Sequence, residues 1–181
     1  MNFSSFLASL VILAQVATIV VLAAYVLFRT TRKNNGLVMF VHRNALGISF
    51  LFSAVAVIGS LFYSDILGLP PCNLCWILRI FVFPQVLLIG MALWRNERTI
   101  LPYALILSVV GFVIAGYQSL LQAGATPDLV PCTVGGYGID CSIVQSLEFG
   151  YITIPLMAAT AFAMLLLTQW IGSDRRIDAA H

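Results

Sequence analysis

Four cysteines are the residues of this chain whose types and spacing could carry chemistry. Cys72 and Cys75 form a Cys-x-x-Cys motif, the spacing at which two thiols can close a small disulfide ring at a helix start. Cys132 and Cys141 lie in the longest polar loop, and three glycines between them make closure of a disulfide easy. Thiol pairs of this kind exchange electrons with other thiols and disulfides.

The surroundings of Cys75 favour a reactive thiol. Pro70 and Pro71 stop any helix upstream, so Cys75 falls in the first turn of the apolar segment that follows. Unpaired N–H groups and the helix dipole in a first turn stabilise a thiolate, which is the reactive form. Arg79 lies four residues further on, on the same helix face. An arginine one turn inside so apolar a helix is costly, so we take it as a candidate to steady the thiolate.

Each of these features also has a purely structural interpretation. Cys72 and Cys75 can form a static disulfide, and Arg79 can snorkel back to the lipid headgroups. Cys132 and Cys141 can staple their loop. A zinc site of four cysteines fits poorly, because eight residues separate the last two and an oxidising compartment favours disulfides over zinc thiolates. We therefore predict no metal.

The chain that positions these cysteines cannot be a soluble globule. Of its 181 residues, 61% are hydrophobic and 9% are charged, whereas about a quarter of a soluble domain is charged. A hydrocarbon core about 30 Å thick needs roughly 20 apolar residues in a helix. Five stretches qualify: Phe6–Phe28, Ala45–Tyr63, Trp76–Trp94, Leu101–Leu121 and Tyr151–Ile171. We predict an all-α integral membrane bundle, since backbone groups in a bilayer must be paired internally.

The basic residues predict how the chain is oriented. Eight of the nine lie in segments that must share one side of the membrane: Arg29, Arg32, Lys33, Arg43, Arg95, Arg98, Arg175 and Arg176. The loops on the opposite side carry acidic residues but no Lys or Arg. Because cytoplasmic loops are rich in Lys and Arg, we expect the N-terminus and all four cysteines outside and the C-terminus in the cytoplasm. Thiol pairs placed there suggest electron transfer between protein thiols and a lipid-soluble carrier.

The motif residues resemble those of the DsbB/BdbC family of disulfide bond formation proteins. The resemblance rests on the run Pro71-Cys72-Asn73-Leu74-Cys75-Trp76-Ile77-Leu78-Arg79 with Pro84, and on Asp140-Cys141-Ser142 with Pro155. It covers roughly residues 45–171 and implies a four-helix transmembrane core. The first span is additional to this core. The short spacing of the loop cysteines is closer to the BdbC-like branch.

The resemblance implies a membrane protein-dithiol:quinone oxidoreductase of the bacterial cytoplasmic (inner) membrane. Such an enzyme reoxidises a thioredoxin-fold thiol oxidase of the DsbA or BdbD type and passes the electrons to ubiquinone or menaquinone. Oxidases of the DsbA type have a known reduction potential of about −120 mV, so the acceptor must be a still stronger oxidant. No nucleic-acid partner is expected, because the basic residues are spread over three short segments.

The resemblance also implies a role for each site residue. Cys132 would accept attack by the partner's thiolate, and Cys141 would pass the electrons to Cys72 and so to Cys75. Arg79 would bind the quinone. Gln118 stands where family members often carry a histidine near the quinone, and it is the second residue that we expect at the quinone site.

Two other functions remain open from the sequence. A non-enzymatic membrane subunit would use both disulfides only to brace its outer loops, and its cysteines would be redox-inert. A reductase similar to vitamin K epoxide reductase would share the chemistry, but that family carries the loop pair before the Cys-x-x-Cys. The order found in this chain argues against it.

The expected organisation has three parts. Residues 1–36 form the extra helix and the start of a cytoplasmic loop, residues 37–174 the four-helix core, and residues 175–181 a cytoplasmic tail. The first span has no basic n-region and is long for a signal peptide, so we expect an uncleaved anchor. Because it contains no cysteine or charge, we expect it to pack on the exterior of the bundle or against a partner, outside the electron path.

Overall fold

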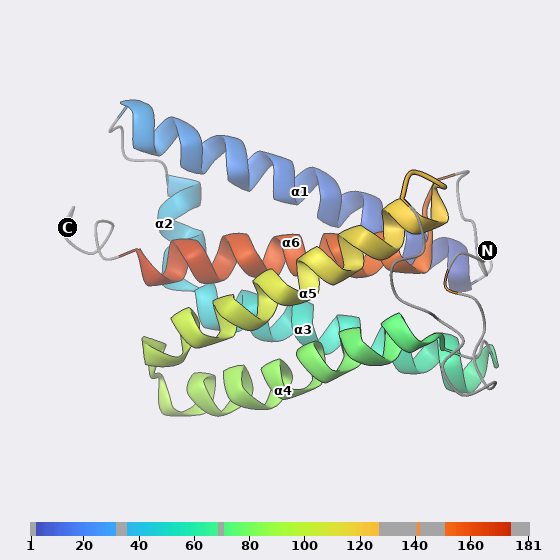
Figure 1. The fold of residues 1–181 in the computed structure, drawn as a ribbon. Coiled ribbons are helices and arrows are strands. Elements are labelled where there is room, and N and C mark those ends of the chain that lie inside the picture. The colour runs from blue at the N-terminus through green and yellow to red at the C-terminus, as the bar shows by residue number, and fades with distance from the viewer. Residues whose placement is uncertain (1–2, 32–35, 69–70, 127–140, 142–150, 175–181) are drawn as a thin grey trace.

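The computed structural model describes residues 3–31, 36–68, 71–126, 141 and 151–174. Its principal helices are α1 (Phe3–Thr31), α2 (Gly36–Arg43), α3 (Ala45–Leu61), α4 (Asn73–Arg95), α5 (Leu101–Gln122) and α6 (Ile154–Ser173). Five of these are long and apolar enough to cross a membrane, α3 together with the turn that follows it. They coincide with the five predicted spans, which confirms an all-α membrane protein (Figure 1).

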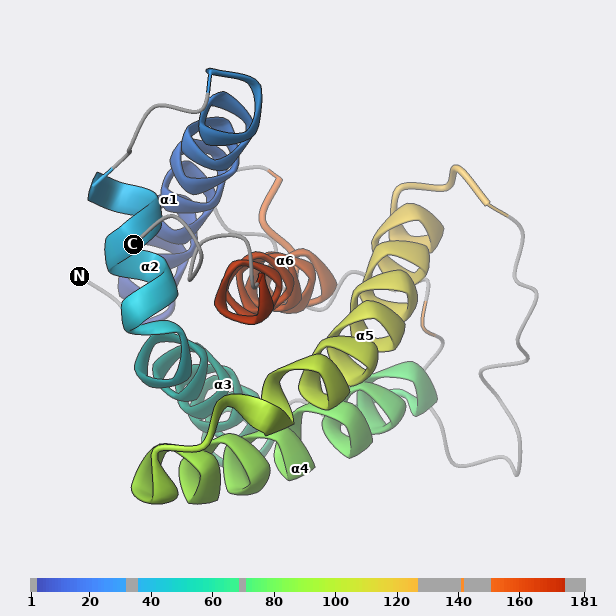
Figure 2. The ribbon, with the colours of Figure 1, turned by 90° about the vertical axis from the view of Figure 1, so that its left-hand side faces the viewer.

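The helix α6 is the centre of the bundle. Viewed end-on, α3, α4 and α5 form an arc around it, and α1 lies on its remaining side (Figure 2). Half of the α6 span is buried inside the protein, compared with 11% of the α1 span. The helices α3 to α6 therefore form the core, and α1 packs on the outside of it.

The basic segment between the first two spans contains a helix that the sequence does not indicate. α2 has only eight residues, too few for a span, and the sequence favours a loop there. Its buried Val38 and Val41 pack with Val21 and Tyr25 of α1 and Ile171 of α6. α2 therefore links α1 to the core at the end opposite the Cys-x-x-Cys motif (Figure 1).

Buried polar side chains join the core helices. Ser108 Oγ of α5 lies 3.1 Å from Gln85 Oε1 of α4 and 2.9 Å from Gln169 Oε1 of α6. Ser49 of α3 and Thr168 of α6 are hydrogen-bonded at 2.9 Å. Because lipid offers such groups no partner, these bonds favour one arrangement of the helices.

Two helix ends position the candidate residues. α3 runs into a π-helical turn, Phe62–Ile66, and π-helical turns are frequent at functional sites. α4 begins at Asn73, with the extended residue Cys72 at its N-cap (φ −72°, ψ 170°). Cys75 therefore lies in the first turn of α4, as Pro70 and Pro71 predict.

Candidate active site

The two motif cysteines form a close pair of thiols. Both are free, and Cys72 Sγ donates a hydrogen bond to Cys75 Sγ at 3.1 Å. Cys72 is buried, whereas Cys75 is partly accessible. The hydrogen bond to Cys75, together with burial, raises the pKa of Cys72 far above its ordinary value. In this hydrogen bond the Cys75 sulfur is the acceptor.

Gln118 of α5 contacts both sulfur atoms. Its Nε2 donates to Cys72 Sγ at 3.2 Å and to Cys75 Sγ at 3.3 Å. The side chain is 1% exposed, and its Oε1 has no hydrogen-bond partner among the described residues. An amide NH₂ has two protons, so it can serve both sulfur atoms. The sequence predicts Gln118 only at the quinone site, and the structure brings it to the thiols themselves.

Arg79 is held by the neighbouring helix α3. Its Nε donates to Ser60 Oγ and its Nη2 to the Ser60 carbonyl, both at 2.9 Å. Its guanidinium carbon lies 5.1 Å from the centre of the Trp76 ring. Of the five N–H groups of an arginine, three find no acceptor in the described part of the chain. The side chain is therefore held against α3 and keeps N–H groups that can bind another acceptor. A snorkelling arginine would instead extend toward the lipid headgroups.

Cys141 lies against the Cys-x-x-Cys motif. It is in a disulfide and is 1% exposed. It belongs to one buried cluster with Cys72, Leu74 and Leu121, and its carbonyl accepts a hydrogen bond of 3.5 Å from Gln122 Nε2. Cys132, which we predicted as the other member of the loop pair, lies outside the described residues. The described member of the second pair thus packs directly on the first.

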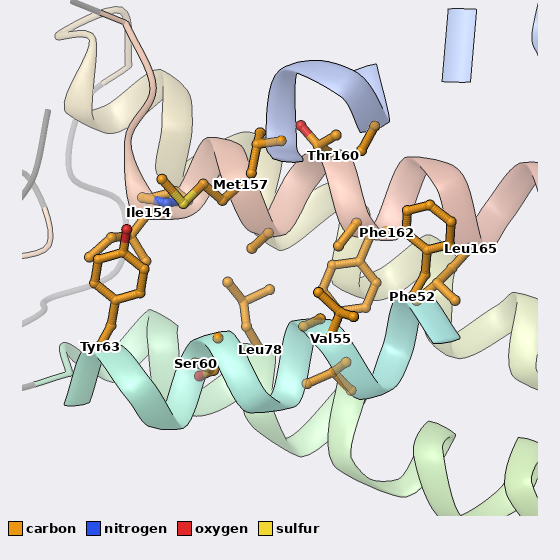
Figure 3. Close-up of a pocket in the computed structure, with 18 of the residues that line it drawn as sticks. Phe52, Val55, Ser60, Tyr63, Leu78, Ile154, Met157, Thr160, Phe162 and Leu165 are labelled. Atoms are coloured by element: carbon orange, nitrogen blue, oxygen red, sulfur yellow. The ribbon is translucent and has the colours of Figure 1, made fainter. Parts of the chain in front are cut away.

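A pocket, here called the thiol pocket, leads away from Cys75. Its volume is about 490 Å³, within the usual range for small-molecule sites. Cys75, Arg79 and Gln118 lie at one end, near Ser60 and Tyr63. Apart from Ser64 and Thr160, the rest of the lining is apolar and comes mainly from α1, α3, α4 and α6. Figure 3 shows Tyr63 and Ile154 at one end and Phe52 and Leu165 at the other.

The thiol pocket fits a quinone. The Arg79 N–H groups that have no acceptor among the described residues can donate to a ring carbonyl. The apolar remainder suits a hydrocarbon tail. Within the described ranges, no three His, Cys, Asp or Glu side chains are grouped to hold a metal ion.

Known proteins with similar sequences are disulfide formation proteins. The model of the family "Disulfide bond formation protein DsbB" matches residues 42–172. A probable disulfide formation protein of Chlamydia caviae is 35% identical, covering 77% of this chain and all of the relative.

Two further relatives have similar names. The probable disulfide formation protein of Metapseudomonas resinovorans is 34% identical, over 68% of this chain and 85% of its own. The probable disulfide formation protein C 2 of Bacillus cereus is 29% identical, over 75% of this chain and 96% of its own. No solved structure matches the chain. The chain belongs to the DsbB family of membrane oxidoreductases that act in disulfide bond formation.

Proposed function

We propose that this protein reoxidises a thioredoxin-fold thiol oxidase of the DsbA or BdbD type and passes the electrons to a membrane quinone, ubiquinone or menaquinone. The observation that carries the proposal is the pair of thiols at the polar end of the thiol pocket. The Sγ atoms of Cys72 and Cys75 lie 3.1 Å apart, and Cys75 and Arg79 line the same largely apolar cavity. A largely apolar cavity beside Cys75 can hold a lipid-soluble electron acceptor next to the thiol pair.

The proposed relay begins at the loop pair. The partner's first thiolate attacks Cys132, which breaks the Cys132–Cys141 bond and forms a mixed disulfide between the partner and Cys132. The partner's second thiolate then attacks the partner sulfur of this mixed disulfide, so that the partner leaves with its own disulfide and Cys132 is released. Cys141 then attacks Cys72, the Cys72–Cys75 bond breaks, and Cys75 leaves as a thiolate. Cys132 next attacks Cys141, which re-forms the loop disulfide and leaves Cys72 and Cys75 reduced. In the structure Cys72 and Cys75 are free thiols and Cys141 is disulfide-bonded. These are the redox states that the relay gives these three cysteines after its last step.

The second half of the relay takes place at the thiol pocket. A bound quinone supplies an acceptor for two electrons and two protons. Arg79 would orient its carbonyl, and Gln118 would keep the Cys75 sulfur in its thiolate form by donating to it. The Cys72–Cys75 disulfide re-forms as both electrons leave the pair. The net reaction converts the partner's dithiol and a quinone into a disulfide and a quinol.

The side of the membrane follows from charge. With the Lys- and Arg-rich end in the cytoplasm, the thiol end faces the compartment in which secreted proteins acquire disulfides. We therefore place the protein in the bacterial cytoplasmic membrane with its cysteines outside.

The test uses the purified full chain in detergent with a reduced thioredoxin-fold oxidase and a quinone. We expect loss of quinone absorbance that matches oxidation of the partner mole for mole, and we expect Cys75→Ser to abolish it. Full turnover by Cys75→Ser would disprove the relay.

A further inference from the structure

The additional helix α1 forms a wall of the thiol pocket. Resting on the function proposed above, we infer that α1 and α3 enclose the isoprenoid tail of the quinone, and that the tail enters from the lipid between these two helices. α1 would then set which tails the protein accepts. This gives the helix a part in acceptor binding that its sequence, without cysteine or charge, does not suggest.

The first observation is the lining of the pocket. Leu10, Val11, Leu13, Ala14 and Ala17 of α1 line the same cavity as Cys75 and Arg79. Small side chains on three walls provide its room: Ala14, Ala17, Ala56, Gly59, Ala158 and Ala161. A Cβ added at Gly59 would meet nothing within 4 Å. These small side chains therefore leave an apolar space, as a polyprenyl chain requires.

The second observation is the length of the pocket. Along α6 it extends from Ile154, near the thiols, to Leu165. Eleven residues of helix correspond to about 16 Å. This is longer than a quinone ring needs, so the end near Phe52 and Leu165 is available to the tail (Figure 3).

The third observation is that α1 is fixed in place at two levels. Toward the thiol end, Gln15 Nε2 donates to Thr160 Oγ1 at 3.2 Å, and Tyr151 Oη donates to Gln15 Oε1 at 3.2 Å. Toward the opposite end, Tyr25 Oη donates to Asp174 Oδ2 at 3.0 Å. These bonds tie α1 to α6 and its flanking residues, so the wall has a defined position.

The fourth observation is the rim. The main contacts of α1 are with α6 and α2, so the bundle is not closed by packing between α1 and α3. Pocket residues on both rims are exposed, with Leu13 at 65%, Leu51 at 60% and Val55 at 47%. In a membrane span, such exposed apolar side chains contact lipid. A lipid-soluble occupant can therefore enter sideways, and a tail is the part of a quinone that matches this path.

The test compares two Ala→Trp variants of α1 in the full chain. Ala14→Trp fills the pocket, whereas Ala23→Trp is the matched control, because Ala23 is exposed and does not line it. Equilibrium binding is measured for a radiolabelled ubiquinone with a long polyprenyl tail and for a tail-less quinone with the same ring. Ala14→Leu is the milder second variant, for use if tryptophan prevents insertion.

We expect Ala14→Trp to weaken binding of the tailed quinone at least about tenfold, which corresponds to about 1.4 kcal/mol. Binding of the tail-less quinone, and both affinities of Ala23→Trp, should stay near those of the unmodified protein. Equal affinities of Ala14→Trp and Ala23→Trp for the tailed quinone would overturn the inference. Equal losses for both quinones would also overturn it, by placing the effect at the ring. If the unmodified protein binds neither quinone, the proposed function itself fails.

Discussion

Gln118 is the one described residue from outside α4 that reaches both motif sulfurs, and its amide explains how Cys75 can hold negative charge in an apolar setting. A hydrogen bond to a charged group contributes about 1.5–3 kcal/mol, more than one between neutral groups. The bond of 3.3 Å to Cys75 Sγ therefore favours the thiolate over the thiol at that sulfur. The helix end adds to this effect.

We predict that Gln118→Leu slows alkylation of Cys75. In the reduced protein at fixed neutral pH, the rate with iodoacetamide should fall about tenfold or more, the equivalent of one lost bond to a charged sulfur. The rate is measured by mass spectrometry of the Cys75 peptide. Ser119→Ala is the control, because the Ser119 hydroxyl bonds only to the Ala115 carbonyl of its own helix among the described residues. Equal rates in the two variants would show that Gln118 does not stabilise the thiolate.

Arg79 differs from Gln118 in that its described hydrogen bonds all go to Ser60, and none goes to a thiol. We predict that Arg79→Lys raises the KM for quinone about fivefold or more, the equivalent of one hydrogen bond of about 1 kcal/mol. Lysine keeps the charge but loses the planar fork that lets arginine bond Ser60 and a second acceptor together. Disulfide formation between Cys72 and Cys75 should persist.

Two further variants separate the functions of Arg79. Ser60→Ala removes the hydroxyl acceptor but keeps the carbonyl acceptor, so its quinone KM should rise less than that of Arg79→Lys. If Arg79→Ala leaves the quinone KM unchanged, the arginine is only an anchor and its assignment to the quinone is wrong.

At the level of helices, one glycine controls how closely α5 approaches α6. A Cβ on Gly111 would overlap the ring of Phe162, which also lines the thiol pocket. We predict that Gly111→Ala lowers the stability of the protein in detergent by about 1–3 kcal/mol, the usual cost of overpacking. Thermal unfolding measures the change. Gly116→Ala is the matched control on the same helix, because its Cβ would meet nothing within 4 Å. A similar Tm for the two variants would contradict this view of the interface.

The helices themselves could be predicted because the bilayer imposes a length on them. Each predicted span overlaps an observed one, and the position of Pro70 and Pro71 in the sequence is enough to place Cys75 in the first turn of α4. α2 could not be predicted in this way, since eight residues give too little periodicity to separate a short helix from a loop.

The contacts of the site were less predictable than its residues. Cys72, Cys75 and Arg79 form a recognisable motif, and Gln118 stands at a position where the family often has a histidine, but nothing marks Ser60 as the partner of Arg79. Likewise, Ala14 and Ala17 of α1 look the same in sequence whether they face lipid or a pocket. Hydropathy is insensitive to this difference, because lipid and an apolar cavity are equally apolar. Such contacts depend on how helices distant in sequence are packed together.

For the whole molecule, the two ends differ in chemistry. The motif thiols, Gln118 and Cys141 are gathered at one end. Helix α2 lies at the other end (Figure 1), and it ends at Arg43, whose carbonyl accepts a hydrogen bond from Arg98. A relay between a soluble partner and a lipid-soluble acceptor needs both cysteine pairs at the same membrane surface. The orientation is therefore as important to the proposed function as the site itself.

We predict that the basic residues, and not α1, determine this orientation. Deleting residues 1–28 removes one span but keeps Arg29, Arg32, Lys33 and Arg43 ahead of α3. Because the bias of Lys and Arg sets topology, the C-terminus should stay in the cytoplasm in both the full and the shortened chain. An alkaline phosphatase fused after His181 should be inactive in both, and a fluorescent protein fused there should fluoresce in both.

Active phosphatase on the shortened chain alone would show that α1 holds the core in its orientation. The same deletion separates orientation from acceptor binding. If the topology is kept but the tailed quinone binds more weakly, α1 acts through the thiol pocket that it lines. If both are kept, the four helices α3 to α6 suffice for the complete site, and α1 is the peripheral anchor that its sequence suggests.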